Sequence, residues 1–361
     1  MLSGIRILDM SRVLAGPLCS MLLADIGADV IKVERPGTGD DTRGWGPPFD
    51  PRGESAYFLS VNRNKLSVSL DFEVAQDVEL LERLMAEADV VLDNFLPGTL
   101  DRRGLAPAVM MARYPRLVWC TIAGFGGGSE RPGYDFVIQA ESGWMAITGD
   151  PAGDPMKVGV ALVDVVAGKD AAIAILGALL ARERTGAGRQ VLISLAASAA
   201  AALVNVAQNA LVSGEEQRRW GNSHPNLVPY QLFQAADRGV VVAVGTDAQW
   251  AACARALDLL DLAADAALAT NAGRVTERER VVGAIAARIG ERPASHWQRV
   301  LSAAGVPCGV VRPVLEVLAE SAGASPLTGM PSSVGGRVRR PPPRLDEHGA
   351  RVRAEGWGAF V

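Results

Sequence analysis

The stretch IRILDMSRVLAGPLCSMLLADIGADVIKVE, from Ile5 to Glu34, decides the fold because it sets two short strands around one helix. Ile5–Asp9 and Asp29–Glu34 are the apolar runs expected to form the strands. Ala15-Gly16-Pro17 is expected to break the chain, and Leu18–Ile26 then has the composition of a helix. A strand, a helix and a second strand in so short a segment are typical of a parallel sheet.

The same alternation continues through the first third of the chain. Further strands are expected at Leu66–Leu70, Asp89–Asp93 and Leu117–Ile122, and Glu73–Glu87 has the apolar spacing of a helix. Short apolar strands that alternate with helices indicate a doubly wound α/β domain.

The second half of the chain has a different pattern. Tyr230–Gln234 and Val240–Val244 flank a turn at Asp237-Arg238-Gly239, which predicts a β-hairpin. Helical segments follow from Asp247 to about Ile289 and from Ser295 to Ala304. These segments predict a smaller α+β domain.

Composition narrows the class of protein. The chain has 361 residues, a net charge of −4 and 49% hydrophobic residues, which favours neither nucleic acid nor an anionic membrane as a partner. Cys19, Cys120, Cys253 and Cys308 lie far apart, so neither a metal site nor a disulfide framework is expected. The first residues lack the apolar region of a signal peptide, and a cytoplasmic protein is expected.

One uncharged stretch, Val191–Ser213, is long enough to suggest a membrane span. Alanine is only weakly apolar, however, and the amides of Asn205, Gln208 and Asn209 would be costly in hydrocarbon. We expect a short strand to about Leu195 and then a long helix that is buried in protein at a subunit interface.

Asp164 is the one carboxylate of the apolar run Lys157–Gly168. This run predicts a buried strand that ends at Asp164, then a turn, then a helix over Ala171–Arg184. Such a carboxylate is either desolvated for chemistry or satisfied as a helix cap, and geometry alone favours the cap or a core turn.

Basic side chains gather in the loops that follow the strands. In open α/β sheets ligands bind outside the carboxyl ends of the strands, where arginines suit a phosphorylated ligand. Asn94 and Phe95 follow a strand and offer an amide and an aromatic face to a base. The turn Val13–Pro17 carries no GxGxxG motif, so the usual dinucleotide fingerprint is absent. The basic residues concerned are Arg35, Arg43, Lys65, Arg102 and Arg103.

A set of short motifs runs along nearly the whole chain. They are Leu8-Asp9 with Arg12 to Pro17, Leu22 to Pro36, Gly39-Asp40 with Arg43, Asn62 to Ser67, Asp71, Asp89 to Gly104, Gly133-Tyr134-Asp135, Thr148-Gly149, the Asp164 segment, Glu183 to Gly186, Gly221-Asn222 with His224-Pro225-Asn226, Gly305-Val306-Pro307 and Pro342-Pro343-Arg344. Together they closely resemble the class III CoA-transferases of the CaiB/BaiF type, a superfamily that includes formyl-CoA transferase, carnitine CoA-transferase and α-methylacyl-CoA racemase.

The resemblance implies an α/β fold with a Rossmann-like parallel-sheet large domain, a small α+β domain and an interlocked homodimer. The domains implied are residues 1–200 for the first part of the large CoA-binding domain, 201–221 for a linker helix region, 222–310 for the small domain and 311–361 for the return to the large domain.

The resemblance also implies the chemistry. Asp164 would attack an acyl-CoA thioester to give an acyl-aspartyl anhydride, and CoA would return to give an aspartyl-CoA thioester before a carboxylic acid takes it away. Tyr134 and Asp135 are the other implied catalytic residues. Coenzyme A would enter as acyl-CoA, with no metal. The implied CoA-binding residues are Val13, Leu14, Ala15, Arg35, Leu70, Asn94, Phe95, Arg102 and Arg103.

Two departures from the family pattern keep alternatives open. Tyr134 stands where the racemases need a histidine, which disfavours racemase or epimerase chemistry. Lys169-Asp170 replace a usually uncharged pair after Asp164, and Glu73 occupies a site that is often basic. The alternatives to a CoA-transferase are therefore a racemase-like enzyme and a catalytically idle acyl-CoA-binding homologue.

Overall fold

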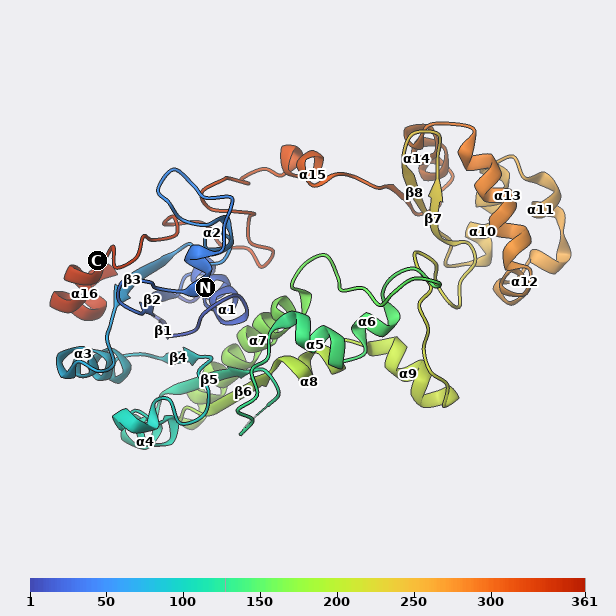
Figure 1. The fold of residues 1–361 in the computed structure, drawn as a ribbon. Coiled ribbons are helices and arrows are strands. Elements are labelled where there is room, and N and C mark those ends of the chain that lie inside the picture. Colours follow the sequence, from blue (N-terminus) through green and yellow to red (C-terminus); the bar gives the residue numbers. More distant parts are fainter. Residues whose placement is uncertain (127, 361) are drawn as a thin grey trace. The chain divides into compact units, whose positions relative to one another are not determined.

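The computed structural model describes residues 1–126 and 128–360, and the chain forms two compact units (Figure 1). The large unit comprises Met1–Met145, Lys157–Glu215 and Ser321–Val361, and the small unit comprises Ala146–Met156 and Glu216–Glu320. The small domain was expected over residues 222–310, whereas the main segment of the small unit runs from Glu216 to Glu320. Residues 146–156 belong to the small unit but were expected in the large domain.

Six parallel strands form the sheet of the large unit, in the order β3-β2-β1-β4-β5-β6. They are β1 (Arg6–Asp9), β2 (Asp29–Glu34), β3 (Lys65–Ser69), β4 (Val90–Asp93), β5 (Val118–Ala123) and β6 (Gln190–Ser194). In the central strand Ile7 lies opposite Val30 on one side and Val90 on the other. This is the strand order of a doubly wound Rossmann-type sheet, and it confirms the predicted parallel-sheet domain.

Helices cover both faces of this sheet. Ile7 packs in a core with α1 (Ala15–Asp25), α7 (Leu162–Thr185) and α8 (Leu195–Ala201), whereas the next residue, Leu8, packs in a second core. The second core includes α3 (Ala75–Ala86), α4 (Pro107–Arg113) and α16 (Gly349–Glu355). Because successive strand side chains point to opposite faces, burial on both faces explains why the strands read as continuous apolar runs.

Two helices begin earlier than the sequence predicted. Helix α1 starts at Ala15 and includes Pro17, because proline is tolerated in a first helical turn. Helix α7 starts at Leu162, so the strand predicted to end at Asp164 is wrong: that residue lies in the first helical turn, and residues 157–160 form no strand. The apolar string before Asp164 has β-branched residues, and no local cap marks the helix start.

The single long helix predicted within Val191–Ser213 is also wrong. Strand β6 ends at Ser194 as expected, but two helices follow, α8 and α9 (Val204–Ser213), and they meet at 68°. Val204 has a φ of 41° at the break, outside the helical region. Within the described residues no single helix is long and apolar enough to cross a membrane. The bent pair α8 and α9 has the length and composition of a membrane span only when its two helices are taken together.

The remaining elements of the large unit are short. They are the 3-10 helices η1 (Asp41–Gly44), η2 (Asp101–Arg103) and η4 (Gly356–Phe360), and the helices α2 (Ala56–Ser60) and α5 (Asp135–Glu141), with α6 (Trp144–Ile147) at the first division between the units.

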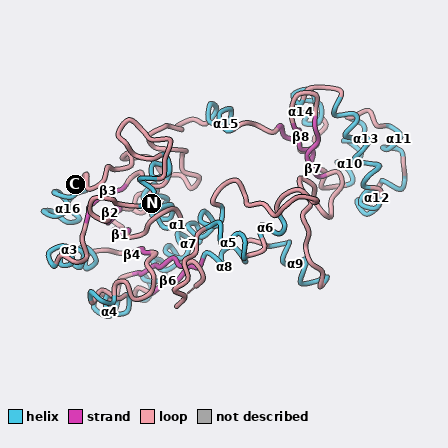
Figure 2. The backbone as a smooth tube through the Cα atoms, in the orientation of Figure 1, coloured by secondary structure: helices cyan, strands magenta, loops and turns pink. Residues whose placement is uncertain are grey.

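The small unit has its own three-stranded antiparallel sheet, in the order β7-β8-β9 (strands magenta in Figure 2). The strands β7 (Tyr230–Gln234) and β8 (Gly239–Ala243) form the predicted hairpin, and β9 (Cys308–Val310) pairs with β8. Its core includes the buried Trp250 and Trp297. Its helices are α10 (Asp247–Ala256), α11 (Leu260–Ala264), η3 (Ala266–Leu268), α12 (Asn271–Thr276), α13 (Arg278–Gly290), α14 (Ala294–Ala303) and α15 (Val314–Glu320).

Candidate active site

Asp164 is a buried carboxylate whose charge is poorly satisfied. Its residue is 8% exposed, and neither a hydrogen bond nor an ion pair to its side chain is found among the described residues. Burial, followed by the negative charge of Asp135, raises its pKa from 3.8 to about 7. A carboxyl group with such a pKa exists in both protonation states near neutral pH, as an acid, base or nucleophile requires.

Asp135 stabilises the start of helix α7. Its Oδ1 accepts hydrogen bonds from the backbone N–H groups of Val163, at 2.8 Å, and Asp164, at 3.3 Å. Its Oδ2 accepts one from Nε2 of Gln139 at 2.6 Å, and Oε1 of Gln139 accepts the N–H of Val158 at 2.9 Å. Asp135 thus caps α7 from a different helix, since two orphan donors of the first turn end on its carboxylate.

The first candidate cavity, of about 240 Å³, opens beside Asp164. Tyr134, 57% exposed, lines it together with Asp164. Of the predicted CoA-binding residues, Val13, Leu14, Ala15, Asn94 and Phe95 also line this cavity.

Two more cavities adjoin the first. A cavity of about 400 Å³ is lined by Arg35 and Leu70, and it shares Phe95 with the first cavity. A third, of about 470 Å³, is lined by Arg102 and Arg103. Because each neighbouring pair shares lining residues, the three cavities form one groove along the carboxyl ends of β1, β2 and β4, the edge that the sequence predicted. The residues shared by the first and second are Arg12, Phe95 and Leu96, those shared by the second and third are Phe72, Glu73, Leu96 and Thr99, and those shared by the first and third are Leu96 and Pro97.

The arginines of this groove have unequal access to a ligand. Arg12 and Arg35 share one carboxylate, that of Asp41, which leaves a positive charge in excess. Arg103 pairs with Glu73, whereas exposed Arg102 has no ion pair among the described residues. The Nε of Arg12 is buried without a hydrogen-bond partner in the described structure. The sequence reasoning did not single out Arg12, which lines two of the three cavities.

Asn94 and Phe95 have different roles. The amide of Asn94 is engaged with the backbone of Arg12: its Oδ1 accepts the N–H at 3.0 Å and its Nδ2 donates to the carbonyl at 2.8 Å. That amide therefore holds the loop after β1, a role that the sequence did not predict. Phe95 packs edge-on against Phe72, with 6.2 Å between ring centroids, and its ring lines the groove.

The pKa of Tyr57, a residue that sequence reasoning did not single out, is influenced by the charges of Asp164 and Asp135. Burial, and then the charges of Asp164 and Asp135, raise its pKa to about 12, so its phenol stays protonated at neutral pH. Its ring contacts Trp45 at 5.2 Å between centroids. Tyr57 lies in the short helix α2, and no motif around it pointed to the site.

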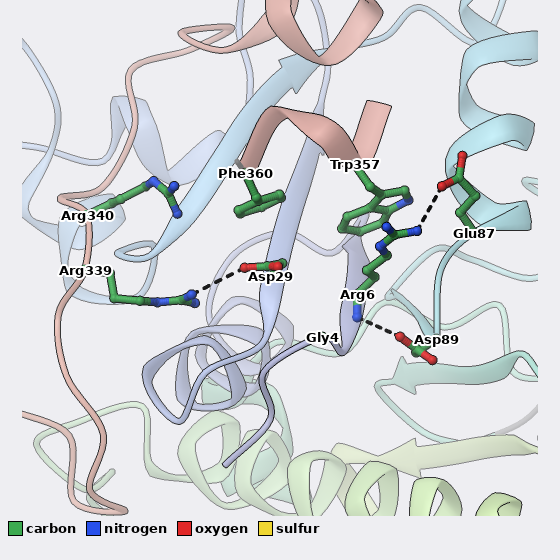
Figure 3. Close-up of a pocket in the computed structure, with 9 residues that line it drawn as sticks. All are labelled: Gly4, Arg6, Asp29, Glu87, Asp89, Arg339, Arg340, Trp357 and Phe360. Atoms are coloured by element: carbon green, nitrogen blue, oxygen red, sulfur yellow. Dashed lines mark hydrogen bonds and ion pairs between the residues drawn. The ribbon is translucent and has the colours of Figure 1, made fainter. Parts of the chain in front are cut away.

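A larger cavity, of about 630 Å³, lies at the opposite edge of the sheet, where β1 and β2 begin (Figure 3). Its charges are largely paired with each other: Arg6 with Glu87 at 2.9 Å, and Arg339 with Asp29 at 3.3 Å. It lies away from the carboxyl ends of the strands, so the smaller cavities at Asp164 make the better candidate site. No three His, Cys, Asp or Glu side chains among the described residues are grouped as a metal would need.

Comparison with known proteins identifies the family. Residues 2–353 match the model of CoA-transferase family III. The chain belongs to this family. It is 39% identical to the succinyl-CoA:glutarate CoA-transferase of Mus musculus, over 98% of this chain and 86% of that protein. It is 37% identical to the succinate–glutarate CoA-transferase of Agrobacterium fabrum, over 98% and 95% of the two chains.

Solved structures of the family have the same fold. A CaiB/BaiF family protein from Brucella suis is 39% identical, with a TM-score of 0.86 over 98% of both chains. A protein from M. tuberculosis is 29% identical, with a TM-score of 0.85 over 97% of this chain and 98% of that one. This family III CoA-transferase therefore places Asp164 at one end of a groove built on a fold that its relatives share.

Proposed function

We propose that the protein transfers CoA from an acyl-CoA donor to a carboxylic acid, with Asp164 as the nucleophile. The observation that carries this proposal is the position of a buried carboxylate with a raised pKa at one end of a groove rich in arginine. Long, phosphorylated acyl-CoA fits such a groove with its thioester at Asp164 and its nucleotide at the arginines.

The proposed reaction proceeds through four acyl transfers. The Asp164 carboxylate attacks the thioester carbonyl and expels CoA thiolate, which leaves an acyl-aspartyl anhydride. The thiolate then attacks the aspartyl carbonyl, releases the donor acid and forms an aspartyl-CoA thioester. The acceptor carboxylate displaces the thiolate to give a second anhydride. Finally the thiolate attacks the acceptor's carbonyl, which regenerates Asp164 and yields the new acyl-CoA.

The environment of Asp164 suits a nucleophile. A carboxylate that is desolvated and lacks hydrogen bonds is more reactive than one in water, and a pKa of about 7 leaves much of it ionised at neutral pH. We propose that Asp135 is a positioning residue that fixes the first turn of α7, and that Tyr134 lines the acyl end of the groove.

We propose that the nucleotide end of CoA lies along Arg35, Arg102 and Arg103, with its base against Phe95. Charge-assisted hydrogen bonds to phosphate contribute roughly 1.5–3 kcal/mol each. Of these three arginines, Arg102 is the one for which no ion pair is found among the described residues, so Arg102→Ala should weaken CoA binding about tenfold. Calorimetry that finds an unchanged CoA affinity would remove Arg102 from the site.

The acid substrates are proposed to be dicarboxylic. Relatives at 37–39% identity are named for succinate and glutarate, and another, 42% identical over 73% of this chain, is a succinyl-CoA:mesaconate CoA-transferase from Haloarcula hispanica. A panel of acyl-CoA donors against mono- and dicarboxylic acceptors tests this assignment.

The nucleophile is tested by trapping. Wild-type protein incubated with acyl-CoA and hydroxylamine should acquire a hydroxamate mass on Asp164, and Asp164→Asn should show neither the mass change nor transfer. Asp170→Asn, on the same helix, is the matched control and should retain both. Equal transfer by wild type and Asp164→Asn would refute the mechanism. Deuterium wash-in at the acyl α-carbon would instead support the racemase-like alternative.

We further propose a homodimer. The large unit leaves apolar side chains on α7 and α9 in solvent: Ile173 and Leu180 are 68% and 59% exposed, and Leu211 and Val212 are each 78% exposed. Exposed apolar groups at this density mark a contact surface. Light scattering should give about 76 kDa, twice the chain mass of 37.9 kDa; a folded species of about 38 kDa would contradict the dimer.

A further inference from the structure

Val13 has a backbone conformation that its side chain disfavours. Its φ is 73°, in the left-handed region, where a β-branched residue is a genuine outlier. The residue lines the same cavity as Asp164 and lies two residues before the start of helix α1. Strain of this kind persists only where the surrounding structure imposes it, so the contacts that impose it shape the wall of the site.

The contact that holds Val13 is a buried ion pair. Both carboxylate oxygens of Asp40 lie 3.3 Å from the N–H of Val13, and Oδ2 accepts a hydrogen bond from Nζ of Lys32 at 2.9 Å. The side chains of Lys32 and Asp40 are both 0% exposed. Lys32 also donates to the carbonyl of Ser11 at 2.9 Å. The pair therefore holds the loop by hydrogen bonds to Ser11 and Val13, the residues on either side of Arg12.

Groups outside the Val13 loop also fix the carboxylate of Asp40. Oδ1 of Asp40 also accepts from the N–H and hydroxyl of Thr42, at 3.0 and 2.8 Å, and the N–H of Asp40 donates to Glu34 at 3.0 Å. Burial raises the pKa of Asp40, but the charge of Lys32 and the hydrogen bonds from Lys32 and Thr42 together outweigh burial and lower that pKa. The carboxylate of Asp40 is thus charged and held in place independently of its contact with the Val13 loop.

We infer that Lys32 and Asp40 are positioning residues that hold Val13 in its left-handed conformation and thereby shape the acyl-CoA site. This inference rests on the proposed function, which supplies the ligand. Stability alone does not account for the pair, because a buried ion pair can be replaced by apolar groups of similar volume with little loss of stability. Its hydrogen bonds to the loop give it a role that an apolar pair lacks.

The test removes both charges together, because one unpaired buried charge endangers the fold. Lys32→Met with Asp40→Leu, which leaves no acceptor for the N–H of Val13, should raise the KM for acyl-CoA and the calorimetric Kd for CoA about tenfold, equivalent to about 1.4 kcal/mol. In a Val13→Gly background the same double substitution should raise both constants about threefold or less, because glycine adopts a positive φ without steric cost. A factor that is equal in the two backgrounds would overturn the inference.

A second buried ion pair provides the matched control. Arg63 and Asp25 pair at 2.6 Å, 2% and 1% exposed, at the other end of α1. Arg63→Met with Asp25→Leu should lower the melting temperature while leaving the Kd for CoA unchanged. If it raises the Kd as much as the Lys32 and Asp40 substitutions do, the effect is general destabilisation and the inference fails. Trapping at Asp164 is read separately, so failure of the proposed chemistry would show there and not in CoA affinity.

Discussion

Replacing Asp164 by asparagine should stabilise the protein, and increasingly so as the pH rises. The folded state raises the pKa of this carboxyl from 3.8 to about 7, so it retains a proton that the unfolded chain releases. Stability is consequently lost as the pH rises from about 4 to about 7, and the whole loss is present above pH 7. Asparagine resembles the protonated acid in shape and has no charge to desolvate.

The pKa change sets the magnitude of this effect. At about 1.4 kcal/mol for each pKa unit, ionising buried Asp164 costs about 4 kcal/mol more in the folded than in the unfolded state. By the same linkage, Asp164→Asn should exceed wild type in stability by about 2 kcal/mol at pH 5 and by about 4 kcal/mol at pH 8. These are upper figures, because the positive end of the α7 dipole returns about 0.3–1 kcal/mol to the carboxylate.

The measurement is chemical denaturation of both proteins at intervals between pH 5 and pH 8. Asp261→Asn, which removes an exposed carboxylate of the small unit, controls for the lost charge and should follow wild type at every pH. If the difference between Asp164→Asn and wild type stays constant across this range, then Asp164 does not titrate there and the reasoning from burial is wrong.

Three further predictions concern the same end of the groove. The kcat/KM should rise with pH through about 7, since attack needs ionised Asp164; a flat profile from pH 5 to 9 would contradict this. Asp135→Asn keeps an acceptor for α7 but removes a neighbouring charge, so the pH–rate inflection should move to lower pH; no shift would show that this charge is unimportant. Gly168→Ala should destabilise the protein by about 1–3 kcal/mol because its Cβ would lie 2.6 Å from the carbonyl oxygen of Ala15, whereas Gly177→Ala, with open space around it, should stabilise by about 0.5–1 kcal/mol; similar denaturation midpoints would refute the packing argument.

The sequence predicted the sheet well for a physical reason. Strands such as Asp29–Glu34 are buried on both faces, so their apolar character is local and visible without the fold. The start of α7 was missed because its cap is not local: the carboxylate that accepts the N–H groups of Val163 and Asp164 comes from Asp135. A single-sequence pattern of β-branched residues cannot reveal such a partner.

In the candidate site, too, the sequence predicted local features but not contacts between distant segments. Placing arginines and Phe95 near one sheet edge needed only the rule that strand ends of a parallel sheet lie together. What the pattern could not assign was the partner of each polar group. Asn94 uses its amide on the loop backbone, and Arg103 is paired with Glu73. These are pairwise contacts between distant segments, and they require coordinates.

The way in which Asp135 caps α7 explains why Asp164 is available for chemistry. A carboxylate in the first turn of a helix would ordinarily be stabilised by the free N–H groups there, which lowers its pKa. Here the N–H groups of Val163 and Asp164 are already bound by Asp135, and the negative charge of Asp135 opposes a second one close by. Asp135 thus fixes the backbone of Asp164. It also occupies the N–H donors that would otherwise stabilise the negative charge of the Asp164 side chain. Asp164 therefore stays reactive because the carboxylate of Asp135, and not its own, accepts the N–H groups at the start of helix α7.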